Sequence, residues 1–103
     1  MKKIYFALPG NENLTEILIQ KEKAEKGMIE IRSFPDGETY VRILSNVKDK
    51  KVFLVCTLHE PDTKLLPLYF LAKTAKEFGA KSICLIVPYL AYMRQDKAFN
   101  TGE

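Results

Sequence analysis

Apolar residues gather in short runs along the chain, each bounded by proline, glycine or charged residues. The runs 4–8, 52–56 and 82–87 are continuous, and continuous runs of this length are typical of parallel strands covered on both faces. Residues 39–44 are β-branched and alternate with polar residues, and residues 28–32 alternate more weakly. Alternation of this kind predicts two further strands.

Two segments carry apolar side chains at helical spacing instead. Asn11 or Asn13 can cap the first, and Glu16 stands three residues after Asn13 as in a capping box. Gly27 is the predicted end of this helix. The stripe that it would bury consists of Leu14, Ile17 and Leu18.

The second helix is expected to begin at Asp62 or Thr63, or near Leu66. Pro67 is the reason for the later start, because a proline inside a helix costs a hydrogen bond. Gly79 would end the helix. The residues expected along its buried face are Leu65, Leu68, Tyr69, Ala72, Ala75 and Phe78.

The order of these elements is strand, helix, three strands, helix and strand. This order predicts an α/β fold in which helices flank a mainly parallel sheet through right-handed crossovers. Between the strands at 28–32 and 39–44, Phe34-Pro35-Asp36-Gly37 has the composition of a β-turn. These two strands are therefore expected to form an antiparallel hairpin or ribbon.

The composition suits one domain with a modest core: 103 residues, of which 47% are hydrophobic. The formal net charge is only +3, and acidic residues interrupt the lysine groups, so nucleic-acid binding is not inferred. Cys56 and Cys84 lie in apolar runs, which favours free, buried thiols in a reducing compartment. The first apolar run is too short for a signal peptide or a membrane span, so we expect a cytoplasmic protein without membrane contact.

Candidate chemistry lies at the predicted turn and after the last strand. Phe34 lies on a turn that also carries two acids, Asp36 and Glu38, and it either serves a ligand or folds back onto the sheet; spacing leaves both open. The segment 87–97 follows the last strand, where open α/β sheets bind ligands. There Arg94 can bind phosphate or stack on a base, and Gln95 can donate to and accept from a base edge. Taken alone, this segment is more often a solvated loop with a local ion pair.

Two other features are weaker indications of a functional site. Pro9-Gly10-Asn11 precedes the first helix, where a phosphate could bind, but a single glycine without a Walker lysine favours a plain turn. His59 is the only histidine and has no paired acid or nucleophile, so it is more often incidental.

Phe34-Pro35-Asp36-Gly37-Glu38 and the later Pro88-Tyr89-Leu90-Ala91-Tyr92-Met93-Arg94-Gln95-Asp96 stand in an order that is specific as a pair. Together they resemble the N-terminal domain of ribose-phosphate pyrophosphokinase, also called phosphoribosyl pyrophosphate synthetase, over essentially the whole chain. The opening Leu-Pro-Gly-Asn resembles a divergent branch. The resemblance implies a phosphoribosyltransferase-like fold and an enzyme that transfers diphosphate from ATP to ribose 5-phosphate with Mg²⁺, giving phosphoribosyl pyrophosphate and AMP.

The resemblance also implies residue roles. Phe34 would stack on adenine, with Asp36 and Glu38 near its amino edge, and all three would come from a neighbouring subunit of a homo-oligomer. Arg94 would cover the other face of adenine or reach the phosphates, and Gln95 would help to hold the nucleotide.

Residues 1–103 would then be an incomplete N-terminal domain, without the second domain, the catalytic loops or the metal ligands. The resemblance therefore assigns no catalytic and no metal-binding residue to this chain, which we expect to be inactive alone. Two alternatives stay open: a non-catalytic regulatory or scaffold protein that assembles with synthetases, and a related enzyme acting on another sugar phosphate.

Overall fold

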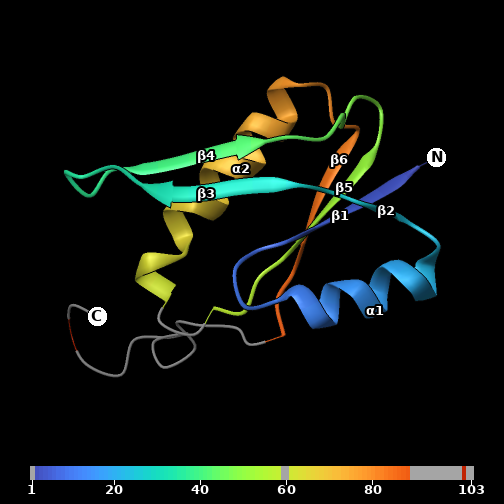
Figure 1. Cartoon of the computed structure of the whole chain (residues 1–103), viewed down its shortest axis with the longest axis horizontal. Helices are drawn as coiled ribbons and strands as arrows, with labels where there is room; N and C mark the ends of the chain where they lie inside the picture. Colours follow the sequence, from blue (N-terminus) through green and yellow to red (C-terminus); the bar gives the residue numbers. More distant parts are fainter. Residues whose placement is uncertain (1, 59–60, 89–100, 102–103) are drawn as a thin grey trace.

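The computed structural model describes residues 2–58, 61–88 and 101. Four parallel strands form one sheet in the order β2-β1-β5-β6, and β3 and β4 form a separate antiparallel ribbon (Figure 1). The α/β class, the mainly parallel sheet, the flanking helices and the ribbon around the Phe34 turn are confirmed. The elements are β1 (Lys3–Ala7), α1 (Glu12–Glu22), β2 (Glu25–Lys26), β3 (Ile29–Ser33), β4 (Thr39–Ile43), β5 (Lys51–Val55), the 3₁₀ turn η1 (Pro61–Thr63), α2 (Leu65–Glu77) and β6 (Ser82–Ile86).

The sheet has a core on each face because side chains alternate along β1 and β5. On one face α2 packs with Phe6, Val52 and Leu54, and on the other face α1 packs with Tyr5 and Val55. The ribbon packs against the same core as α2. The ribbon side chains that pack against this core are Ile29, Ile31, Val41 and Ile43.

Helix α1 buries the expected face in part, because Leu14 and Leu18 pack against the core formed with Tyr5 and Val55 but Ile17 does not. Ile17 is 63% exposed, whereas Thr15 and Ile19 are buried. Neither asparagine forms the predicted cap through its side chain, and the helix ends at Lys23, in the left-handed conformation (φ 53°). It ends there rather than at Gly27 because the chain turns back to form β2 beside β1.

Helix α2 tolerates Pro67 because this is only its third residue, in the first turn, where backbone N–H groups have no partner within the helix. Leu68, Leu71 and Ala75 form the buried face. The expected burial of Leu65, Tyr69 and Phe78 is wrong, because they are 40%, 56% and 63% exposed. Gly79 follows the helix with φ 92°, so the predicted stop is confirmed.

Strand β6 was expected to be buried, yet Cys84 and Leu85 are exposed. Strand β6 is exposed because it lies at one edge of the sheet, whereas α1 lies against β1 and β2 toward the opposite edge. Cys56 directly follows β5, a central strand of the sheet, and is buried as predicted. Both thiols are free.

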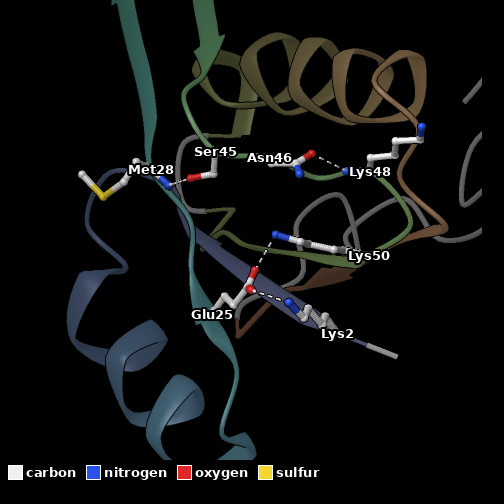
Figure 2. Close-up of polar contacts among 7 residues, drawn as sticks. All are labelled: Lys2, Glu25, Met28, Ser45, Asn46, Lys48 and Lys50. Atoms are coloured by element: carbon white, nitrogen blue, oxygen red, sulfur yellow. Dashed lines mark hydrogen bonds and ion pairs between the residues drawn. The ribbon is translucent and has the colours of Figure 1, made fainter.

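Polar contacts fasten the base of the ribbon and the nearby sheet edge (Figure 2). The Met28 N–H donates to Ser45 Oγ at 2.8 Å, where the two ribbon strands meet the rest of the fold. Lys50 Nζ donates to Glu25 Oε2 at 2.7 Å, and Lys2 Nζ lies 4.0 Å from the other oxygen of this carboxylate. Glu25 thus links β2 to the residue before β5, and the ribbon starts from a fixed position.

Candidate functional site

The tip of the ribbon is a closed turn built by residues 34–38. Ser33 and Thr39 are the last pair of the ladder. Beyond them the Phe34 N–H donates to the Glu38 carbonyl at 2.7 Å, and the Gly37 N–H donates to the Phe34 carbonyl at 2.8 Å. Gly37 has φ 91°, a conformation that favours glycine. The predicted turn is confirmed, and it lies at the far end of the ribbon, projecting beyond the sheet (Figure 1).

The three tip residues that were singled out from the sequence lie together on this turn. Phe34 is 40% exposed, so it does not fold back into the core. Asp36 and Glu38 are both exposed. Asp36 also has a structural role, because its Oδ1 accepts a hydrogen bond from the Glu38 N–H at 3.0 Å. One carboxylate oxygen of Asp36 thus holds the turn, and the other oxygen can accept from a ligand.

Two residues that the sequence analysis passed over complete the tip. Arg32 and Tyr40 face each other across the ribbon. The guanidinium carbon of Arg32 lies 4.3 Å from the centroid of the Tyr40 ring and 5.5 Å from that of Phe34. The rings of Phe34 and Tyr40 meet edge to face, with centroids 5.6 Å apart. The signal was present in the sequence, since a closed turn over 34–38 pairs residue 32 with residue 40.

The loop before α1 is a structural turn. Both carboxylate oxygens of Glu12 accept from the Gly10 N–H, at 3.1 and 3.0 Å, so a carboxylate takes the place that a phosphate would need. Asn11 is buried, and its Oδ1 accepts from Thr57 Oγ1 at 2.8 Å, which ties this loop to the residues after β5. The plain-turn interpretation of Pro9-Gly10-Asn11 is therefore supported.

A cavity of about 220 Å³ lies between these loops and the start of α2. Its lining is mainly apolar and includes Ile31 of the ribbon and Lys64, which precedes α2. Burial raises the pKa of the Cys56 thiol in this wall, and the nearby charge of Lys64 opposes that effect. Cys56 therefore stays protonated near neutral pH and is unsuited to act as a nucleophile.

Arg94, Gln95 and His59 lie outside the described residues. Within 2–58 and 61–88, no three His, Cys, Asp or Glu side chains gather into a group that could hold a metal ion, so none of these residues is assigned to Mg²⁺. In the same part of the chain no helix is long and apolar enough to cross a membrane.

Comparison with known proteins gives consistent results. The family described as the N-terminal domain of ribose phosphate pyrophosphokinase matches residues 3–103. The ribose-phosphate pyrophosphokinase of Saccharolobus solfataricus is 47% identical over 76 residues, which are 73% of this chain and 26% of that protein. That of Sulfolobus acidocaldarius is 37% identical over 94 residues, 90% of this chain and 31% of the relative. The chain thus spans about a quarter to a third of the length of these relatives.

Solved structures share the fold. Phosphoribosylpyrophosphate synthetase from Mycobacterium smegmatis superposes with a TM-score of 0.89 at 24% identity, covering 100% of this chain and 35% of that one. A hypoxanthine phosphoribosyltransferase from Staphylococcus aureus gives 0.60 at 17% identity, with 82% of this chain and 49% of that one covered. The expected phosphoribosyltransferase-like architecture is confirmed.

Proposed function

Because the chain belongs to the ribose-phosphate pyrophosphokinase family and matches the N-terminal domain, we propose that the tip of its ribbon binds the adenine of ATP in a synthetase. The whole enzyme would transfer the β,γ-diphosphoryl group of ATP to ribose 5-phosphate and release AMP. The observation that carries the proposal is the exposed Phe34, held by its neighbours at the end of a projecting ribbon.

The chemistry of the tip suits adenine. An aromatic ring that keeps 40% of its surface exposed can stack on a base, and stacking of this kind is worth about 1–3 kcal/mol. The carboxylates of Asp36 and Glu38 accept hydrogen bonds, as an exocyclic amino group requires. The cation of the tip, Arg32, lies against the Phe34 and Tyr40 rings and pairs with Glu30, so another cation would be needed for the phosphates. Arg94 would take that role or cover the second face of the base, and Gln95 would help to hold the nucleotide.

The position of the tip supports a site shared between subunits. The turn projects beyond the sheet of its own chain, so its exposed ring can reach a neighbouring molecule (Figure 1). We therefore propose a homo-oligomer in which Phe34, Asp36 and Glu38 of one subunit complete the nucleotide site of the next. We also expect the whole enzyme to use Mg²⁺.

The test is the effect of Phe34→Ala in the full-length protein. We expect the KM for ATP to rise by about one to two powers of ten, with the KM for ribose 5-phosphate nearly unchanged. Phe78→Ala is a matched control, since Phe78 is an exposed phenylalanine at the far end of α2. An unchanged KM for ATP in Phe34→Ala would contradict the adenine role. A wild-type protein that forms no phosphoribosyl pyrophosphate would instead favour a scaffold or a different acceptor sugar.

A further inference from the structure

The face of the ribbon that is turned away from the core carries a cluster of side chains near the tip. Ile31 and Val41 point to the core, so strand alternation turns Arg32 and Tyr40 to the opposite face. Phe34 contacts both of them although it lies in the turn. These three side chains form one cluster at the tip.

Arg32 is the centre of this cluster. Its guanidinium carbon lies over both rings, 4.3 Å from the Tyr40 centroid and 5.5 Å from the Phe34 centroid. Arg32 Nε also lies 3.4 Å from Glu30 Oε2, two residues earlier on the same strand. The guanidinium thus contacts two rings and one carboxylate, and these contacts limit where the Phe34 ring can lie.

We propose that Arg32 and Tyr40 are positioning residues that fix the Phe34 ring for stacking on the adenine of ATP. The inference rests on the proposed function, because it assigns the support of the same ring. An exposed phenylalanine on a turn would otherwise sample several rotamers, and binding a base would have to restrict them. If Arg32 and Tyr40 already hold the ring before ATP binds, less conformational entropy is lost on binding, which is the general advantage of a preorganised site.

The planar shape of arginine is what the position requires. A guanidinium plane can stack on aromatic rings while its edge pairs with a carboxylate, whereas a lysine ammonium is a point charge on a flexible stem. Cation–π contacts at exposed sites contribute modestly. We therefore expect a clear but limited effect on ATP affinity and none on the acceptor sugar.

The experiment compares single and double variants of the full-length enzyme. Arg32→Gln and Arg32→Lys should each raise the KM for ATP by about two- to fivefold, the range expected for an exposed cation–π contact. Both should leave kcat and the KM for ribose 5-phosphate unchanged. Tyr40→Leu removes the ring that faces the guanidinium and should raise the KM for ATP within the same range. Arg42→Gln is the matched control, because Arg42 is exposed on the same face and stands two residue pairs further from the tip.

The double variant Phe34→Ala/Arg32→Gln separates positioning from direct contact. If Arg32 acts only through the Phe34 ring, removing Arg32 from Phe34→Ala adds nothing further to the KM for ATP. Additive effects would overturn the inference, since Arg32 would then contact the nucleotide itself. Wild-type behaviour of Arg32→Lys, or of Arg32→Gln beside an impaired Phe34→Ala, would overturn it while leaving the proposed function intact. An unimpaired Phe34→Ala would overturn both.

Discussion

The backbone of Gly27 lies so close to the ring of Phe6 that a Cβ at residue 27 would overlap the ring. Phe6 is fully buried, and the Gly27 N–H donates to the Tyr5 carbonyl at 2.8 Å, so neither the ring nor the backbone at residue 27 can move away easily. Gly27→Ala is therefore expected to lower the free energy of unfolding by about 1–3 kcal/mol, as overpacked cores do. Urea denaturation followed by circular dichroism measures this change.

A second substitution checks the cause. Phe6→Leu shortens the ring side chain and should itself destabilise the core, but Gly27→Ala should cost less in that background because space has opened. Equal costs of Gly27→Ala in both backgrounds would show that the backbone at residue 27, and not the Phe6 ring, is the source of the effect.

The pairing of Glu25 with Lys50 makes stability depend on pH. The hydrogen bond from Lys50 holds the pKa of the Glu25 carboxyl below its ordinary value of 4.5, with smaller help from the charge of Lys2. A carboxyl whose pKa is lower in the folded state stabilises the fold above its unfolded pKa, and the contribution is lost as the pH falls through the folded pKa. Glu25→Gln should therefore be less stable than wild type at pH 7, and the difference should shrink below about pH 4.5.

The matched control for this prediction is Glu22→Gln, which removes an exposed pair with Lys3 at 3.4 Å. Lys50 is the more buried partner, with 15% of its side chain exposed against 37% for Lys3, so Glu22→Gln should change stability less. Denaturation curves between pH 3 and pH 7 for the three proteins test both points. A gap between wild type and Glu25→Gln that stays constant over this range would contradict the assignment.

Asp36 holds the turn through its hydrogen bond with the Glu38 N–H, and we propose that it also binds the nucleotide. Asp36→Asn retains the oxygen that accepts from the Glu38 N–H and removes only the charge, whereas Asp36→Ala removes both. Asp36→Asn should keep wild-type stability and weaken ATP binding in the full-length enzyme. Asp36→Ala should lose about 0.5–1.5 kcal/mol of stability as well, the usual contribution of one hydrogen bond. Calorimetric titration with ATP and thermal unfolding give the two quantities, and equal stability of both variants would refute the turn role.

The strands and the ribbon could be predicted because their signals are local. Apolar runs bounded by turn residues gave the places of β1, β5 and β6, and the Pro35-Asp36-Gly37 sequence gave the tip of the ribbon. Strand β2 could not be found this way, since it consists of Glu25 and Lys26 and exists only because β1 offers an edge. The exposure of Cys84 likewise depends on the order of strands in the sheet, which no local pattern contains.

The site was predictable in part for the same reason. Phe34, Asp36 and Glu38 were found as a motif, and the structure places them on one turn. The contact of Arg32 with two rings needs the register of the ribbon, which follows only once the turn is known to close between Phe34 and Glu38. On α1 only Ile17 was misjudged, since it is apolar yet exposed. Thr15 was missed because it is polar, and it is buried with its Oγ1 donating to the Asn11 carbonyl at 2.6 Å.

The central claim is that the Phe34 tip of one subunit completes the nucleotide site of another. It is tested most directly by mixing two full-length variants, Phe34→Ala and Arg94→Ala, each impaired as a pure oligomer, and measuring phosphoribosyl pyrophosphate formation after dissociation and reassembly. A shared site predicts that mixing restores activity, because some sites then combine an intact Phe34 from one subunit with an intact Arg94 from the other. If each subunit built its site from its own two residues, every site would keep one defect, and a mixture no more active than the average of the two variants would contradict the account.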